Sequence, residues 1–358
     1  MFNVIQLNTA EGLSEYEILI KTVQTKNPYY LVDYLDVFCD GFNDLICFYY
    51  IPKDKNEFII MPGHLRQIVI DDTPMDYFDF TTPYGYSGPL ITKNIQDSHL
   101  QFFWEQVDNW YKQNKVVTEF IRFSLEGNHA FYTGIVHPTM LNIRGAIISE
   151  EDQWKAFDYK VRKNIKRAQN ENLISQIYYE SIEEFHVKEF YEVYIQTMIR
   201  TNAKESFFYK FDDFLKFITS NKLHVAICTV YFDSTPISTE LLLVSNNTIF
   251  SFLGGTDEAY FDKRPNDFLK FEVINWARKM KFKHYVLGGG YGFEDGIFKY
   301  KKAFFPDNVV CFNTGRKIVN KTVYDELVEK LLASRAKKGL EQINLTENNF
   351  FPSYRFSN

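Results

Sequence analysis

Lysines and aromatic side chains alternate in residues 296–306, GIFKYKKAFFP, which carry most of the chemistry that the sequence suggests. Lys301 follows Tyr300 there, within a run of three lysines and four aromatic residues that ends at a proline. A lysine held among aromatic rings is partly desolvated, so its positive charge acts more strongly there than in water. Such a group can stabilise an oxygen that gains negative charge during acyl transfer. The alternative is a short amphipathic helix whose lysines reach into solvent.

A second basic segment, KVRKNIKR, places five cations within residues 160–167. Like charges three and four residues apart repel each other on a helix, and a bound anion would offset that cost. Phosphate is the expected anion, because the planar guanidinium of Arg162 matches phosphate oxygens, with Lys160 beside it. A solvated face without a ligand is the alternative, and the sequence favours neither.

A turn-rich loop, TPYGYSGPL, occupies residues 82–90. Glycine permits close approach of a ligand, and tyrosine offers both a ring and a hydroxyl. Tyr84, Gly85 and Tyr86 are therefore candidates to line a substrate cleft, with an ordinary turn as the alternative.

The glycine run GGGYG at residues 288–292 does not have the spacing of a dinucleotide-binding loop or the Lys-Ser/Thr ending of a phosphate-binding loop. We interpret it as a turn that brings Tyr291 and the following lysines toward a cleft. The seven histidines form no metal-ligand pair, and no GxSxG nucleophile motif is present, so we expect no metal.

Composition bounds the class of protein. The chain has 358 residues, of which 45% are hydrophobic and 18% aromatic, and this content excludes global disorder. Its net charge of −6 argues against an autonomous nucleic-acid binder. Four cysteines without a CxxC pair indicate free thiols in a reducing compartment. We find no signal-peptide pattern and no apolar run that could span a membrane, so we expect a cytoplasmic protein with no more than peripheral membrane contact.

The elements that must position these segments alternate between strands and helices, which predicts a mixed α/β (α+β) class. Predicted strands are 45–51, 57–61, 67–70, 116–123, 174–179, 224–231, 236–244, 248–253 and 283–287; predicted helices are 97–113, 149–168, 182–200, 210–219 and 267–281. The pattern Val-x-Asn-Trp occurs in two of these helices, at 107–110 and 273–276, each time before a strand. This echo suggests a tandem duplication of one fold.

Taken in order, three segments resemble the FemAB-like acyltransferases, a family on the GNAT fold that includes the aminoacyl-tRNA-dependent peptidoglycan-bridge ligases. The segments are the loop 82–90, the helix WKAFDYKVRKNIKRA at 154–168 followed by YIQTMIRTNA at 194–203, and the ending 296–306. The resemblance covers residues 27–329.

The resemblance implies two tandem GNAT-like domains, each a mixed, mostly antiparallel sheet flanked by helices. We place an N-terminal GNAT-like domain at residues 1–147. The basic helix and a C-terminal acyltransferase domain follow at 148–332, and a tail at 333–358.

The activity that the resemblance implies is transfer of an acyl or aminoacyl group onto an amine of a cell-envelope precursor or glycan. Tyr300 and Lys301 match a catalytic aromatic–lysine pair of the family, with tyrosine where phenylalanine is usual. Arg162, with Lys160, matches a basic residue that contacts acceptor phosphate. The expected substrate-binding residues are Lys160, Arg162, Tyr84, Gly85, Tyr86, Arg200 and Tyr291.

The donor implied is acyl-CoA or aminoacyl-tRNA, with no permanently bound cofactor. The place of the glycine-rich pyrophosphate loop of CoA-dependent relatives reads DKRPND here, residues 262–267, so its backbone amides are less free to wrap a pyrophosphate. Lys263 and Arg264 are the residues that would bind the donor there. The partners implied are a phosphate-bearing envelope precursor and tRNA. The alternative function is a non-catalytic binding protein on the same fold, for an anionic precursor or RNA.

Overall fold

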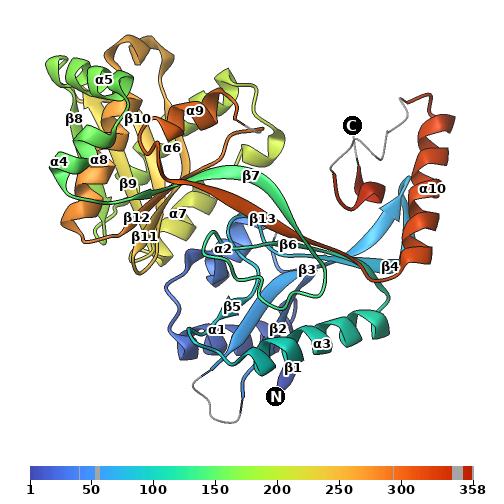
Figure 1. The fold of residues 1–358 in the computed structure, drawn as a ribbon. Coiled ribbons are helices and arrows are strands. Elements are labelled where there is room, and N and C mark those ends of the chain that lie inside the picture. The colour runs from blue at the N-terminus through green and yellow to red at the C-terminus, as the bar shows by residue number, and fades with distance from the viewer. Residues whose placement is uncertain (40, 53–56, 293, 341–349, 357–358) are drawn as a thin grey trace. The chain divides into compact units, whose positions relative to one another are not determined.

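The computed structural model describes residues 1–39, 41–52, 57–292, 294–340 and 350–356 (Figure 1). Contacts divide the chain into two compact units. Unit 1 comprises Met1–Thr25, Phe38–Thr139 and Phe312–Asn358, and unit 2 comprises Lys26–Val37 and Met140–Cys311. Each unit is thus assembled from separate stretches of the chain. The domain limits expected at residues 147 and 332 stay predictions.

Unit 1 is built around a sheet in the order β1-β2-β3-β4-β6-β13, with β5 also pairing with β3. Its strands are β1 (Phe2–Gln6), β2 (Leu45–Tyr50), β3 (Ile59–Ile70), β4 (Thr73–Thr81), β5 (Leu90–Ile91), β6 (Val116–Arg122) and β13 (Val309–Ile318), the last of which begins in unit 2. Its long helices are α1 (Ala10–Val23), α3 (Asp97–Gln113) and α10 (Lys321–Lys337).

Unit 2 has a sheet in the order β7-β12-β11-β10-β9-β8. Its strands are β7 (Ile135–Ala146), which begins in unit 1, β8 (Ile174–Tyr179), β9 (Val225–Phe232), β10 (Thr235–Val244), β11 (Thr248–Thr256) and β12 (His284–Gly288). Its helices are α2 (Val32–Phe38), α4 (Glu150–Ala156), α5 (Tyr159–Asn170), α6 (Glu184–Arg200), α7 (Phe211–Ser220), α8 (Pro265–Lys279) and α9 (Gly296–Lys302). The prediction of a mixed, mostly antiparallel sheet flanked by helices is confirmed.

Among the strands that the structure describes, each unit has a parallel pair, and a helix connects the two strands of that pair. In unit 1, β4 and β6 are parallel and α3 lies between them in the chain. In unit 2, β11 and β12 are parallel and α8 lies between them. These are the two helices that carry the Val-x-Asn-Trp pattern, and in both the valine is buried and the tryptophan packs against the core. The echo in the sequence therefore marks equivalent elements.

The helix predicted over 149–168 is two helices, α4 and α5, separated at Phe157 and Asp158. Phe157 has an extended backbone and buries its ring in the core of unit 2, against Phe304. The Asp158 side chain accepts a hydrogen bond from the Lys160 backbone N–H and begins α5. An N-cap of this kind starts a new helix, which the continuous apolar stripe did not reveal.

Two predicted strands, 57–61 and 67–70, belong to the single strand β3, whose central residues include Pro62 and Gly63. A proline and a glycine are usually read as breaks, but Gly63 here makes room for the Phe80 ring, which lies where a side chain would be. Sequence patterns also did not reveal β1, β4, β7, β13 and α10.

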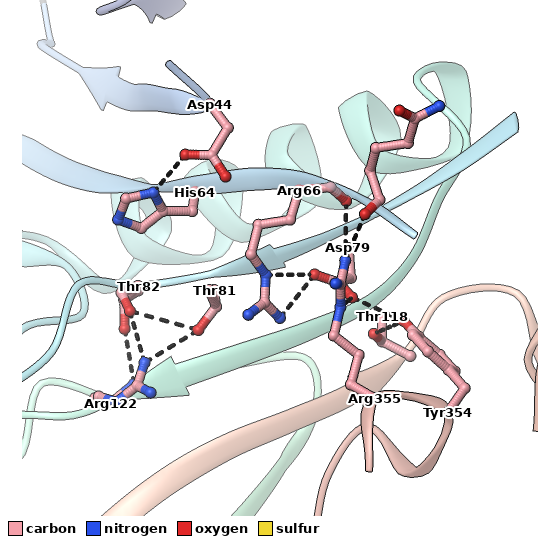
Figure 2. Close-up of polar contacts among 11 residues, drawn as sticks. Asp44, His64, Arg66, Asp79, Thr81, Thr82, Thr118, Arg122, Tyr354 and Arg355 are labelled. Atoms are coloured by element: carbon pink, nitrogen blue, oxygen red, sulfur yellow. Dashed lines mark hydrogen bonds and ion pairs between the residues drawn. The ribbon is translucent and has the colours of Figure 1, made fainter. Parts of the chain in front are cut away.

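The C-terminal segment packs on unit 1 through the buried carboxylate of Asp79, which is 1% exposed (Figure 2). Arg66 on β3 donates to Asp79 at 2.8 Å, and Arg355 donates to the other carboxylate oxygen at 2.5 Å. The Tyr354 hydroxyl lies 2.6 Å from Thr118 Oγ1 and 3.3 Å from Asp79. Part of the tail predicted from residue 333 is therefore an integral part of unit 1.

Asp79→Asn should destabilise the protein by about 1–3 kcal/mol, because Arg66 and Arg355 lose the charged, buried acceptor that they share. Urea denaturation measures the change. Asp76→Asn, which removes an exposed carboxylate from the same strand, is the matched control and should leave the midpoint unchanged. Equal midpoints for the two variants would contradict the role assigned to Asp79.

Candidate active site

Unit 2 contains a pocket of about 480 Å³. It is lined by the C-terminal half of α6, by β10 and β11, by the start of α8 and by α9. Two glycines of β11, Gly254 and Gly255, line it; side chains there would collide with the Thr239 and Val193 carbonyl oxygens respectively. The glycines therefore allow β11 to lie close to β10 and α6.

A buried ion pair between Glu240 on β10 and Lys270 on α8 forms part of the pocket wall. The two residues are 3% and 6% exposed. Lys270 Nζ also donates to Ser251 Oγ at 3.0 Å, and the Tyr285 hydroxyl donates to Glu240 at 2.6 Å. Ser251 donates to Glu240 as well.

These contacts satisfy both buried charges. A buried charge is tolerated when it is paired and its remaining hydrogen-bonding positions are filled, as they are here. The pair joins β10 and β11 to α8 and β12 at the level of the pocket, so it holds four elements of the pocket in a defined arrangement.

Helix α9 places Lys301 on the pocket. The Asp295 carboxylate accepts from the Phe298 N–H at 2.7 Å and begins the helix, and Gly290 leaves the space that this carboxylate occupies. Lys301 Nζ donates to the Gly289 carbonyl oxygen at 2.6 Å. Burial, and then the charge of Lys270, lower the pKa of Lys301 to about 8.

Tyr300 also lines the pocket. Its ring packs against Phe304 at 5.4 Å, and its hydroxyl is buried without a hydrogen-bond partner among the described residues. Burial raises the pKa of Tyr300 well above its usual value, so the hydroxyl keeps its proton. An unpaired buried hydroxyl costs free energy unless a ligand or water supplies a partner.

The beginning of α8 forms another part of the pocket wall. Arg264 adopts a left-handed backbone with φ of 60°, and Pro265 follows at the first helical position. Asp267 in the first turn is 8% exposed and accepts a hydrogen bond from Asn164 at 3.1 Å. Burial raises the pKa of Asp267, although Asn164 and the nearby charges of Arg264 and Lys160 oppose the shift.

Arg200, at the end of α6, lines the pocket and lies over the Phe261 ring at 5.1 Å. The structure thus brings together four residues that the sequence singled out: Lys301, Tyr300, Arg200 and Arg264.

The other predicted residues of unit 2 lie outside this group. Arg162 donates to backbone carbonyl oxygens at the end of α4, including Lys155 O at 3.1 Å. Lys160 is exposed, but its charge is close enough to Asp267 to oppose the rise in the pKa of that carboxyl. Lys263 pairs with Glu171 at 2.8 Å. Tyr291 is 87% exposed, and none of these four lines the pocket.

The tyrosine loop belongs to unit 1. Tyr84 is 60% exposed, Gly85 has φ of 98°, and Tyr86 packs its ring against Phe312 at 5.6 Å. The backbone turn that required glycine is present. The substrate-binding role expected of these three residues stays a prediction.

Sequence reasoning missed Glu240, Lys270 and Asp267. A signal was present for the first two, because each charge lies within a largely apolar stretch, STELLLV and FLKFEVI. A charge on a buried strand requires a partner, and two such charges of opposite sign in one domain are candidates for each other.

No group of described residues has the composition of a metal site. None of the helices within the described ranges is long and apolar enough to cross a membrane.

Residues 156–302 match the sequence model of an acetyltransferase (GNAT) domain, and every residue that lines the pocket falls within this match. Residues 156–302 are therefore a GNAT domain, and the protein is an acyltransferase. None of the curated proteins compared with this acyltransferase matches it in sequence.

Solved structures with a similar fold cover most of the chain. FemX is similar with a TM-score of 0.57 and 10% identity, over 78% of this chain and 89% of FemX. The C-terminal domain of a protein assigned as lysylphosphatidylglycerol synthetase from Agrobacterium fabrum has a TM-score of 0.58 and 12% identity, over 92% of this chain and 99% of that domain. L-PGS from Bacillus licheniformis has a TM-score of 0.57 and 12% identity, over 89% of this chain and 96% of that one.

Lys270→Met should destabilise the acyltransferase by about 3–5 kcal/mol, because it leaves the Glu240 carboxylate buried without a counter-charge. Denaturant unfolding of the single variant and of the double variant Lys270→Met with Glu240→Met measures this. The double variant should be more stable than the single one, since it removes both charges. A single variant as stable as the wild type would show that the pair is not structurally important.

Proposed function

We propose that this pocket transfers an aminoacyl group from an aminoacyl ester, of the kind found on tRNA, onto an amine of a phosphate-bearing envelope precursor. The observation that carries the proposal is Lys301, a half-buried lysine that lines the pocket and whose positive charge is disfavoured there by desolvation. A partly desolvated cation interacts most strongly with an oxygen that becomes negative during the reaction.

The reaction needs few groups. The acceptor nitrogen bonds to the carbonyl carbon of the donor, and the carbonyl oxygen takes up negative charge next to protonated Lys301. When that oxyanion collapses, the ester C–O bond breaks, and the departing ribose oxygen takes the proton that the amine releases. Tyr300 has the unpartnered hydroxyl to relay that proton. The pocket supplies proximity and the exclusion of water.

The start of α8 bears on the choice of donor. A coenzyme A pyrophosphate would bind to free backbone N–H groups at this helix end. Here Pro265 supplies no N–H, and the Asp267 carboxylate lies in the first turn, where it would repel phosphate. The free ammonium of an aminoacyl ester would instead be attracted to Asp267. These features favour an aminoacyl donor over acyl-CoA.

The similarity in fold to the lysylphosphatidylglycerol synthetases also favours an aminoacyl donor. The name of the lysylphosphatidylglycerol synthetases describes attachment of an aminoacyl group to a phosphate-bearing lipid. For this chain, we propose Lys160 and Arg200 as the cations that contact the acceptor, since Lys160 is exposed and Arg200 lines the pocket.

Lys301→Ala should lower the transfer rate by about 10²–10³-fold, as loss of an oxyanion-stabilising donor does. For the wild type, kcat should fall as the pH rises through about 8, because Lys301 loses its proton there. Lys301→Arg should lack this alkaline fall, since arginine stays charged. Transfer of a labelled amino acid from a mixed aminoacyl-tRNA pool to envelope precursors measures the rates. A wild-type rate that rises through pH 8 would instead make Lys301 a base.

Calorimetric titration can test the donor. A non-hydrolysable 3′-aminoacylamino-3′-deoxyadenosine should bind more tightly than acetyl-CoA. Asp267→Asn should weaken its binding about tenfold, because a charge-assisted hydrogen bond to the ammonium is lost. Binding of the N-acetylated analogue should not change.

Asp262→Asn, which removes an exposed carboxylate five residues before Asp267, is the matched control. Tighter binding of acetyl-CoA than of the adenosine analogue would contradict the donor preference and leave acyl transfer standing.

A further inference from the structure

One face of the sheet of unit 1 carries a group of basic side chains that the proposed reaction does not use. His64 on β3 lies opposite Thr81 on β4, Thr81 lies opposite Phe120 on β6, and Phe120 lies opposite Arg316 on β13. Directly opposed residues of neighbouring strands point to the same side of a sheet, so these four form one row.

Two further arginines flank this row on the same face. Arg66 follows His64 by two residues on β3, and Arg122 follows Phe120 by two residues on β6. Arg122 Nη1 donates to Thr81 Oγ1 at 3.0 Å, and its guanidinium lies over the Phe120 ring at 5.0 Å. Figure 2 shows Thr81 between His64, Arg66 and Arg122. We call this group the arginine face: His64, Arg66, Arg122 and Arg316 around Thr81 and Phe120.

The arginine face carries more positive charge than its ion pairs with carboxylates balance. Asp79 is a single carboxylate shared by Arg66 and Arg355, so one charge of that trio is unbalanced. Arg316 forms no ion pair with a described residue, its Nε is buried without a partner, and its guanidinium lies over the Phe351 ring at 5.9 Å. Burial lowers the pKa of Arg316, which means that the fold disfavours its charged form. A partly buried cation whose Nε–H has no acceptor is destabilising unless a bound anion supplies one.

The geometry points to a phosphate or diphosphate group bound on the arginine face of unit 1. A tetrahedral anion near −2 would balance the two unpaired charges, and guanidinium groups that approach from different strands can each meet a separate oxygen. His64 adds a ring nitrogen, because its Nδ1 is held by Asp44 at 2.6 Å and its Nε2 lies on the far side of the ring. The Thr81 hydroxyl stands at the centre of the group.

Isothermal titration of the full chain with inorganic pyrophosphate tests the site. The wild type should bind saturably, and Arg316→Gln should weaken binding about tenfold, because one charge-assisted contact is lost. Arg122→Gln is the second variant, for use if circular dichroism shows that Arg316→Gln does not fold. Lys115→Gln removes the same charge from an exposed pair of unit 1 and should leave binding unchanged.

Vesicle co-sedimentation then distinguishes the sources of the phosphate. Binding to vesicles that contain phosphatidylglycerol, but not to phosphatidylcholine alone, would assign a lipid headgroup. Binding of pyrophosphate without vesicle binding would assign a soluble phosphate ester. Either result supports the site if the Arg316→Gln variant loses the binding that the wild type shows.

Three results would overturn the proposed phosphate site on the arginine face. One is no saturable binding of either probe by the wild type. Another is an equal loss in Lys115→Gln, which would indicate general charge rather than a site. The third is a loss in Arg264→Gln with none in the two arginine-face variants, which would place the anion in the pocket of unit 2. None of these results depends on whether the pocket transfers acyl groups.

Discussion

The buried ion pair between Glu240 and Lys270 is the constraint on which the pocket of unit 2 depends. Two charges cannot remain in an apolar core unless each finds the other and all remaining hydrogen-bonding positions are filled. Ser251 and Tyr285 complete those positions, so two further strands are committed to the same point. The pair also acts on the chemistry, because the charge of Lys270 helps to lower the pKa of Lys301. One interaction therefore both positions the pocket wall and lowers the pKa of the lysine that lines it.

Unit 1 also contains a buried glutamate paired with a lysine, but this pair does not line the pocket. Glu119 on β6 is fully buried, accepts from the Tyr111 hydroxyl at 2.7 Å and pairs with Lys317 at 3.1 Å. Lys317 also pairs with Asp108 and lies over the rings of Trp104, Tyr111 and Tyr132. The second carboxylate and the aromatic rings leave the side chain of this lysine only 9% exposed. A buried glutamate, lysine and tyrosine thus occur in both units, but the pair in unit 2 lies on a pocket and the pair in unit 1 lies inside a core. This difference agrees with a reaction at unit 2 and a structural or binding role for unit 1.

How much could be predicted from the sequence depended on the range of the interaction involved. Helix α3 was predicted with its observed ends, because an amphipathic period is a local signal. Lys301 and Tyr300, which line the pocket, could be singled out because lysine and aromatic residues adjoin each other in the chain. The break between α4 and α5 was missed, since it depends on where Phe157 finds its core. Glu240 and Lys270 lie 30 residues apart, and Asp79 and Arg355 lie 276 apart, so only a folded chain shows that they are partners.

The separate stretches that make up unit 1 have a consequence for biosynthesis. Residues 140–308 of unit 2 emerge from the ribosome before β13, α10 and the Arg355 segment. Until those last residues emerge, β6 lacks its β13 neighbour, and Asp79 lacks one of its two arginines. Because chains begin to fold during synthesis, unit 2 can close first, while unit 1 must wait with an unpaired strand edge. The order of assembly in the cell is then the reverse of the order in which the two units begin in the sequence.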